Sequence, residues 1–109
     1  MTRQCSVFYN GILAGTLAKV VDTTSTFIFT YDECYLSSGK PSIALDLPKR
    51  REAYQSSVLF PFFEGLLPEG ENRALFCAMH KMDPRDSYSI LLKLANKETI
   101  GAITVMEDA

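Results

Sequence analysis

The sequence has 109 residues, of which 47% are hydrophobic and 22% are charged, and it contains 7 Phe and 5 Tyr. This length and composition exclude a disordered regulator and predict a single folded domain over residues 1–109. The formal net charge of −2, with a pI near 5.3, provides no general positive field for a phosphate backbone, so nucleic acid is not expected as a direct partner.

The first two predicted strands, residues 4–9 and 12–20, form an antiparallel hairpin. They flank Asn10-Gly11, the dipeptide that most readily takes the left-handed φ values of a type I′ turn. Gly15, within the second strand, predicts a bulge or a close approach of another backbone. Alternation along this strand predicts one shared face for Leu13, Gly15 and Leu17.

Two further strands and a helical turn are predicted before a polar loop. Residues 26–31 alternate as a strand, with one face carrying Phe27, Phe29 and Tyr31. Asp32 caps a helical turn that runs to Ser37. Residues 42–47 predict a fourth strand, bracketed by prolines and alternating at Ile43, Leu45 and Leu47. Residues 49–57, which include the basic run Lys49-Arg50-Arg51, are interpreted as an exposed, mobile loop rather than as a binding patch.

The second half of the chain predicts helices and a closing strand. Residues 60–67 form a helical turn, and residues 71–81 form an amphipathic helix. The apolar stripe of that helix consists of Ala74, Leu75, Ala78, Met79 and Met82. A last helix is capped by Asp83-Pro84 or by Asp86 and runs to about Ala95, with Ile90, Leu91 and Leu94 inward. Residues 100–106 form the closing strand. Five strands with late helices predict an α+β fold with a mostly antiparallel sheet and three to four short helices.

The possible motifs for chemistry have simpler explanations. Residues 38–42 superficially resemble a phosphate loop, but Cys34 and Pro41 occupy positions where that pattern needs Gly and Ser or Thr. The carboxylates of Glu64 and Glu69 are not interpreted as an acid-base pair, because charges at a helix start explain the acidic residues of this region. The catalytic loop, the metal-binding D-F-G and the glycine-rich loop of protein kinases are missing.

The cysteines and the histidine do not predict a metal site. Cys5, Cys34 and Cys77 are widely spaced and odd in number, and His80 is the only histidine. We therefore expect reduced thiols, no metal, no cofactor, no catalytic residue and no enzymatic activity. A weaker enzyme hypothesis uses Cys77 and His80, which lie one helical turn apart. Without a signal region or an apolar run of about 18 residues, the protein is expected in the cytoplasm and not in a membrane.

The stretch F-P-F-F-E-G-L-L-P-E-G-E-N-R, residues 60–73, combines apolar side chains with closely spaced Gly and Pro, which predicts a shaped turn between helices. With N-G-I-L-A-G-T-L at residues 10–17 and L-L-K-L-A-N-K-E-T-I-G-A-I-T-V at residues 91–105, the chain resembles the N-terminal subdomain of HipA-type serine/threonine kinase toxins. The three motifs occur in the family's order and cover nearly the whole chain.

This resemblance implies a small curved sheet or partial barrel with helices packed on it. Because the chain ends at Ala109, where a full kinase toxin continues into its catalytic body, it resembles a HipS-type antitoxin. The resemblance implies binding to a separate HipA-like kinase toxin of the HipT type, which the antitoxin holds inactive. Our hypothesis for the inhibitory step is docking on the N-terminal lobe of that kinase near the nucleotide cleft. A helix-turn-helix repressor of the HipB type is implied as a third component of such modules.

The predicted contact surface for this partner lies in the shaped turn, because a few apolar groups in fixed geometry usually dominate an interface. Its residues are Phe62, Phe63, Glu64, Leu66, Leu67, Pro68 and Glu69. Some of these side chains must also belong to the core. The alternative hypothesis is a non-inhibitory structural or regulatory subunit, or an excised N-terminal subdomain, of a HipA-type kinase.

Overall fold

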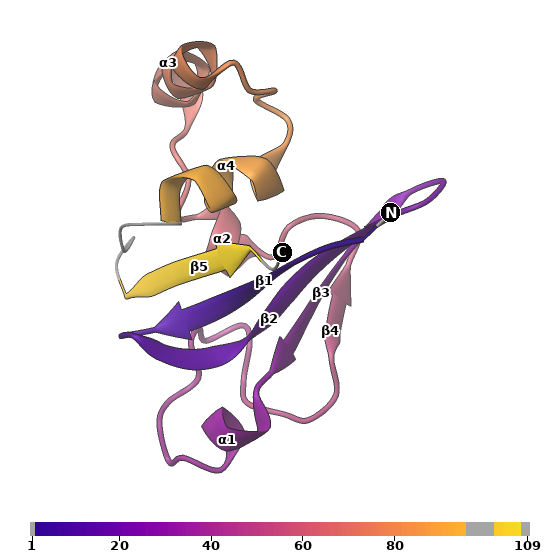
Figure 1. Cartoon of the computed structure of the whole chain (residues 1–109), viewed down its shortest axis with the longest axis vertical. Helices are drawn as coiled ribbons and strands as arrows, with labels where there is room; N and C mark the ends of the chain where they lie inside the picture. The colour runs from indigo at the N-terminus through magenta and orange to yellow at the C-terminus, as the bar shows by residue number, and fades with distance from the viewer. Residues whose placement is uncertain (1, 96–101, 108–109) are drawn as a thin grey trace.

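The computed structural model describes residues 2–95 and 102–107. The strands are β1 (Thr2–Tyr9), β2 (Ile12–Val21), β3 (Ser25–Tyr31), β4 (Tyr54–Ser56) and β5 (Ile103–Glu107). The helices are α1 (Glu33–Leu36), α2 (Pro61–Glu64), α3 (Gly70–His80) and α4 (Ser87–Ala95). The strands form one curved, open, antiparallel sheet in the order β4-β3-β2-β1-β5. The α+β prediction is confirmed, and Figure 1 shows α3 at the end of the molecule farthest from α1.

The predicted β1-β2 hairpin is confirmed, with φ values of 51° at Asn10 and 79° at Gly11, as a type I′ turn requires. A bulge follows, because Val7 pairs with Gly15 and Phe8 pairs with Leu13. Gly15 also meets the next strand closely: a Cβ on this residue would lie 2.3 Å from the carbonyl oxygen of Thr30. The bulge and the close approach predicted from Gly15 are therefore both present.

The bulge overturns one detail of the predicted alternation. Ala14 is the extra residue of β2, so the side chains before and after it no longer alternate in one register. Ala14 and Leu17 are buried, whereas Leu13 is 38% exposed. Leu13 and Leu17 therefore do not share one environment, as uninterrupted alternation would require.

The core lies between the inner face of the sheet and the helices α2 and α4. The sheet contributes Cys5, Val7, Leu17, Phe27, Phe29, Tyr31, Ile103 and Val105, all buried. The helix α4 contributes Tyr88, Ile90, Leu91, Leu92 and Ala95. Its inward face is confirmed at Ile90 and Leu91, with Leu94 packed against the core. The Asp86 alternative for its cap is also confirmed, because the backbone N–H of Ser89 donates to Asp86 Oδ1 at 3.1 Å.

The predicted strand over residues 42–47 is wrong. This segment is a tight turn with a single β-bridge between Ala44 and Leu47, and Leu45 is fully exposed at its tip. The Tyr31 hydroxyl holds the turn, since it accepts from the backbone N–H of Ile43 at 3.2 Å and donates to the carbonyl of Leu47. A buried side chain thus satisfies backbone groups that a strand would have paired with a neighbour.

The strand β4, which the sequence did not predict, lies inside the segment predicted to be a loop. Residues 54–56 form β4, which pairs with β3 at Phe27, Ile28 and Phe29. Arg50 stacks on the Tyr54 ring, 3.7 Å from its centroid, and donates to the carbonyls of Glu52 and Ala53. The Arg50 side chain of the basic run therefore packs against residues 52–54 of the same segment.

The remaining predicted elements agree with the structure at their described residues. Asp32 caps α1, because its carboxylate accepts from the backbone N–H groups of Cys34 and Tyr35. The closing strand is confirmed from Ile103 onward, and its predicted start at Ile100 lies outside the described residues. The predicted helix after the shaped turn is confirmed as α3, but Leu75 and Met79 of its apolar stripe face solvent.

Candidate functional site

The shaped turn is the segment of residues 60–73 that joins α2 to the start of α3. Pro61 begins α2, and Gly65 ends it, donating its N–H to the Pro61 carbonyl at 2.9 Å. The backbone then doubles back, and Gly70 starts α3 with φ at 57°, a left-handed value that favours glycine. The concentration of backbone breakers therefore produces a compact reversal between two helices.

An ion pair joins the two ends of this turn. Arg73 Nη1 donates to Glu64 Oε1 at 2.9 Å, while Nε donates to the carbonyl of Pro84 at 2.7 Å and Nη2 to Ser87 Oγ at 2.8 Å. The Arg73 side chain is only 16% exposed. A single guanidinium thus connects α2, the loop before α4 and the first residue of α4, and it fixes α3 to the rest of the domain.

Two of the predicted contact residues belong to the core. Phe63 is fully buried, with its ring centroid 5.8 Å from that of Phe29, and Leu67 is 5% exposed. Neither side chain is available to a partner while the domain is folded. Because both side chains pack in the hydrophobic core, they fix the conformation of the turn.

The remaining predicted contact residues reach the surface to different extents. Phe62, Leu66 and Pro68 are half-buried, with Phe62 packed edge-on against Phe63 at 5.2 Å between ring centroids. Glu69 is exposed, and the Glu64 carboxylate is committed to Arg73. The structure therefore brings Phe62, Leu66, Pro68 and Glu69 to the solvent side of the turn; below, these four residues are called the turn surface.

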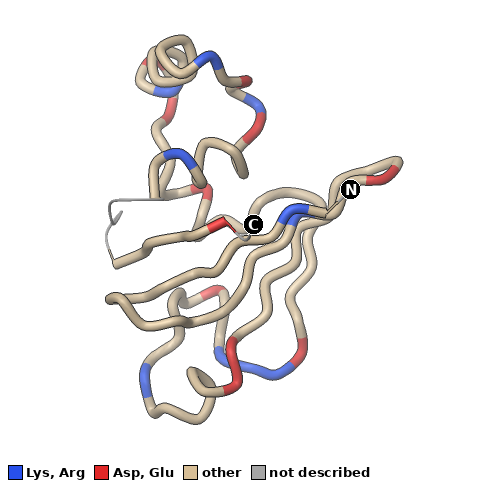
Figure 2. Tube along the Cα trace, in the orientation of Figure 1, with Lys and Arg blue, Asp and Glu red and all other residues tan. Residues whose placement is uncertain are grey.

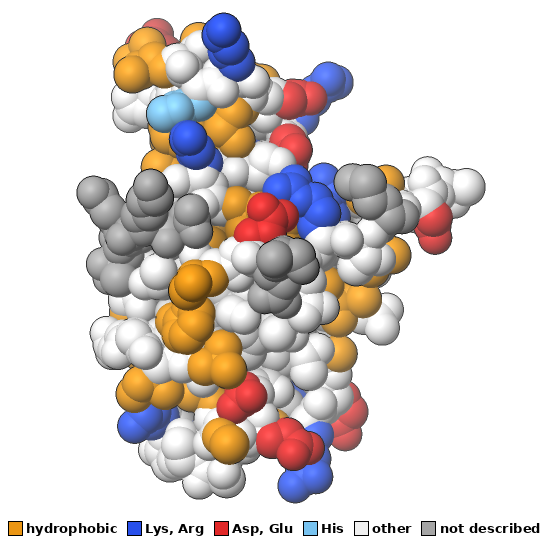
Figure 3. Space-filling model, in the orientation of Figure 1, with side chains coloured by type: hydrophobic (Ala, Val, Ile, Leu, Met, Phe, Trp, Pro, Cys, Tyr) orange, Lys and Arg blue, Asp and Glu red, His pale blue; other side chains and the backbone are white. Residues whose placement is uncertain are grey.

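The sequence did not show that two other apolar groups are exposed. Leu75 and Met79 on α3 are 62% and 70% exposed. On the sheet face opposite the core, Leu13 and Met106 are 38% and 55% exposed, beside the half-buried Phe8. Figure 3 shows hydrophobic side chains on α3 and, separately, over β5, β1 and β2. Helical spacing in α3 revealed the first group, but spacing alone does not tell which side of a helix packs inward.

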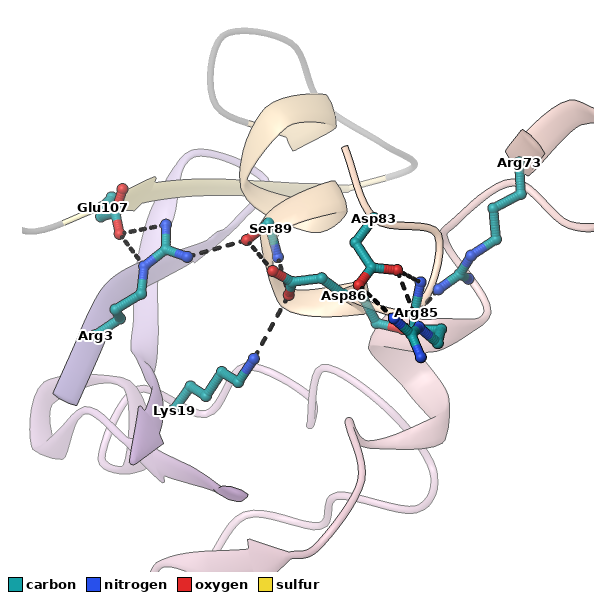
Figure 4. A network of polar contacts seen from close by, with 9 residues as sticks. Arg3, Lys19, Arg73, Asp83, Arg85, Asp86, Ser89 and Glu107 are labelled. Carbon is teal, nitrogen blue, oxygen red and sulfur yellow. Dashed lines mark hydrogen bonds and ion pairs between the residues drawn. The ribbon is translucent and has the colours of Figure 1, made fainter. Parts of the chain in front are cut away.

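A chain of polar contacts fixes the start of α4 against the sheet (Figure 4). Glu107 Oε2 accepts from Arg3, Arg3 Nη1 donates to Ser89 Oγ at 3.0 Å, and Ser89 Oγ donates to Asp86 Oδ2 at 2.7 Å. Lys19 Nζ lies 3.5 Å from Asp86 Oδ1. Burial acts to raise the pKa of Asp86, but the hydrogen bonds from Ser89 and the charge of Lys19 outweigh it and leave the pKa below 3.8.

An open groove of about 450 Å³ lies beside the turn. Its lining includes Lys19, Phe27, Val58, Glu64 and Arg85 together with three serines. Both cations have carboxylate partners, since Lys19 pairs with Asp86 and Arg85 pairs with Asp83 at 3.2 Å. Such a groove does not have the unpaired positive charge that anion binding requires.

The structure provides little for the enzyme hypothesis. Cys77 is 1% exposed, whereas His80 is exposed and its ring packs on Phe76 with centroids 4.4 Å apart. Among residues 2–95 and 102–107, no three His, Cys, Asp or Glu side chains group closely enough to hold a metal ion.

No helix in the described part of the chain is both long and apolar enough to cross a bilayer. Figure 2 shows basic and acidic residues interspersed along the trace.

Comparison with known proteins gives a consistent result over nearly the whole chain. The family model described as the HipA N-terminal domain matches residues 5–106. An uncharacterized protein of Haemophilus influenzae is 28% identical over 108 residues, which cover 99% of this chain and 95% of that protein. The putative kinase Y4mE of Sinorhizobium fredii is 26% identical over 107 residues, which cover 97% of this chain but only 25% of the kinase. A solved structure described as the N-terminal domain of HipA toxin superimposes with a TM-score of 0.71 at 27% identity, over 98% of this chain and 93% of that chain.

Proposed function

The chain belongs to the HipA N-terminal domain family, and from this premise we propose that it is a HipS-type antitoxin that binds and neutralises a HipA-like serine/threonine kinase toxin. The partner is a HipT-type kinase that lacks this domain. A HipB-type helix-turn-helix repressor joins the two proteins as a third component. The activity of the chain is binding, and the kinase carries the catalytic groups.

The observation that carries this proposal is that related domains occur both as nearly the whole of a short protein and as a small part of a long one. The chain covers 95% of a short relative, but only 25% of a putative kinase. In the long protein the domain is covalently joined to a much larger body, so part of its surface is available for contact with that body. A separate copy retains the same kind of surface, and this surface provides a contact for a kinase that has no such domain of its own.

The proposed contact uses the turn surface of Phe62, Leu66, Pro68 and Glu69. These side chains form the solvent side of the shaped turn. The ion pair between Glu64 and Arg73 joins the two ends of this turn. Because the turn is already ordered, docking loses less conformational entropy than docking of a flexible loop. Seated on the N-terminal lobe near the nucleotide cleft, the turn obstructs the lobe closure or loop ordering that phosphoryl transfer requires.

The test uses a purified HipA-like serine/threonine kinase that lacks this domain. We expect the wild-type domain to bind that kinase and to abolish its autophosphorylation at a stoichiometric ratio. The double variant Phe62→Asp, Leu66→Asp is expected to lose both effects while it keeps a cooperative unfolding transition. Leu45→Asp is the matched control, because Leu45 is fully exposed in a different turn. A wild-type domain that does not bind the kinase overturns the proposal.

The second candidate function is that of a non-inhibitory subunit that completes the kinase. The putative kinase that contains a related domain within its own chain favours this candidate, because there the domain coexists with the kinase body. The same assay separates the two candidates. Unchanged or increased phosphorylation in the complex supports the subunit, whereas loss of phosphorylation supports the antitoxin.

A further inference from the structure

We infer that the cleft between α1 and residues 49–51 is a binding site for a phosphate monoester group. The cleft has a volume of about 250 Å³, and its lining consists of Glu33, Leu36, Ser37, Lys49, Arg50 and Arg51. Pockets that enclose a whole small molecule have roughly 300–1,000 Å³, so this cleft suits a single functional group. Such a site is independent of the proposed function, and it assigns a ligand to the basic run, for which the sequence alone favoured a solvated loop.

The three cations of this cleft have no carboxylate partner. Every ion pair within residues 2–95 and 102–107 involves a cation outside the cleft. Lys49, Arg50 and Arg51 form none, although Glu33 lines the same cleft. Three cations and one carboxylate leave a formal charge of +2 there. A phosphate monoester carries a charge of about −1.5 to −2 at pH 7 and therefore matches the cleft, whereas a carboxylate would leave about half of its charge uncompensated.

The fold holds two of the three cations in place. Lys49 is half-buried, with Nζ 5.4 Å from the centroid of the Tyr35 ring, and it donates to the carbonyl of Lys40 at 2.7 Å. Arg50 stacks on the Tyr54 ring and donates to two backbone carbonyls of its own segment. Both side chains retain further N–H groups for a ligand. Because the two cations are already positioned, binding costs less side-chain entropy than binding to freely moving lysines and arginines.

The third cation is free to bind. Arg51 is exposed, and its side chain has no hydrogen-bond partner among the described residues. A guanidinium can contact two oxygens of one phosphate group at once, so we expect Arg51 to provide the largest share of the affinity.

The end of α1 does not oppose an anion strongly. Ser37 Oγ donates to the carbonyls of Glu33 and Cys34 at 3.3 and 3.2 Å. The hydroxyl thereby offsets the partial negative charge that carbonyls carry at the end of a helix. The Glu33 carboxylate is then the one charged group of the cleft that repels a phosphate.

The test is an NMR titration of the wild-type protein at constant ionic strength. The ligands are inorganic phosphate and acetyl-O-phosphoserine amide, which is a phosphorylated residue without charged ends. We expect saturable changes in the backbone amide shifts of residues 33–37 and 49–51. This measurement needs no variant, so it does not depend on the stability of a mutant.

Substitutions of opposite sign then test the role of each charge. Arg51→Gln should raise the Kd for the phosphoserine ligand by about fivefold, the upper range for one exposed charge pair. Glu33→Gln should lower the same Kd, because it removes the repelling carboxylate. Lys93→Gln is the matched control, since it removes an equal charge from an exposed cation on α4, and it should leave the Kd nearly unchanged. Unfolding curves verify the fold of each variant.

The two ligands identify the source of the phosphate group. Tighter binding of the phosphoserine ligand supports a phosphorylated residue of another molecule, whereas inorganic phosphate that binds at least as tightly supports the free ion. Unchanged amide shifts in both segments overturn the inference, as do equal effects of Arg51→Gln and Lys93→Gln or acetate binding as tight as that of phosphate. A single-stranded oligonucleotide that binds more tightly than both ligands would assign the cations to a phosphodiester backbone and would also overturn it.

Discussion

The Glu64 carboxylate and the Arg73 guanidinium lie 2.9 Å apart and close the shaped turn across a separation of nine residues. The same guanidinium donates to the Pro84 carbonyl and to Ser87 Oγ. Arg73, the last residue of the shaped turn, therefore connects α2, the loop before α4 and the first residue of α4. The conformation of the turn surface depends on it, because it holds the end of α2 against α3 and the loop before α4.

Replacement of Arg73 by Lys is expected to lower the free energy of unfolding by about 1–2 kcal/mol, because one ammonium group cannot reproduce the planar set of donors that reaches three acceptors. Solvent screens part of the Glu64–Arg73 interaction, since the Glu64 side chain is 42% exposed. Urea unfolding measures the effect. Arg85→Lys is the control, because that side chain is 91% exposed and should leave the free energy of unfolding nearly unchanged. Equal effects of the two substitutions would contradict the structural role of Arg73.

Local signals in the sequence predict the parts of the fold that local physics determines. Asn10-Gly11 fixes the hairpin through backbone φ values, and the alternation of β3 places three aromatic side chains inward. Residues 42–47 show where such signals fail, because alternation also arises in a turn whose alternate residues Ile43 and Leu47 are buried. The distant Tyr31 hydroxyl decides between the two, and no local pattern predicts a contact 16 residues away.

The candidate site shows the same division between local and long-range information. The concentration of glycine and proline locates the turn, but α2 has only four residues, too few for periodicity to separate the buried Phe63 from the half-buried Phe62. On α3, spacing correctly identifies a stripe but not its direction. Contacts of Arg73 with residues 9 to 14 positions away turn that stripe outward.

The two adjacent aromatic residues of α2 should respond differently to truncation. Phe63→Ala removes a fully buried ring from the core and is expected to lower the free energy of unfolding by about 3–5 kcal/mol. Phe62→Ala should cost clearly less, about 1–2 kcal/mol, because part of its ring is already in water. Chemical denaturation of both variants measures the difference. Comparable losses would show that Phe62 is a core residue and would remove it from the turn surface.

Asp86 is expected to link stability to acid pH. Its pKa in the folded state lies below the ordinary value near 3.8, so its contribution is complete above about pH 4 and is lost as the pH falls through the folded pKa. Asp86→Asn keeps a good helix cap but removes the charge facing Lys19. The variant should be less stable than wild type at pH 7, and the difference should shrink at about pH 3. Urea unfolding at both pH values measures it, and a difference independent of pH would contradict the assignment.

Gly15→Ala should destabilise the sheet by about 1–3 kcal/mol, because the added methyl group collides with the strand beside it. The new Cβ would lie 2.3 Å from the Thr30 carbonyl oxygen, and backbone cannot move as a side chain can. Gly39→Ala provides a contrast, since its φ of 60° is strained for alanine but nothing lies within 4 Å of its Cβ. We expect thermal unfolding to show a larger loss for Gly15→Ala. A greater loss at Gly39 would indicate that β2 and β3 adjust to the methyl group.

Tyr31→Phe tests whether one hydroxyl maintains the turn of residues 42–47. The substitution leaves the ring in place but removes the acceptor for the Ile43 N–H and the donor to the Leu47 carbonyl. Because both backbone groups belong to buried residues, we expect a loss of about 1–3 kcal/mol in the free energy of unfolding. Faster hydrogen exchange at the Ile43 amide should accompany it. Tyr54→Phe is the matched control, since the Tyr54 hydroxyl donates to the exposed Pro48 carbonyl, which water can satisfy instead. Unchanged exchange at Ile43 would mean that the buried side chains of Ile43 and Leu47 hold the turn without the hydroxyl.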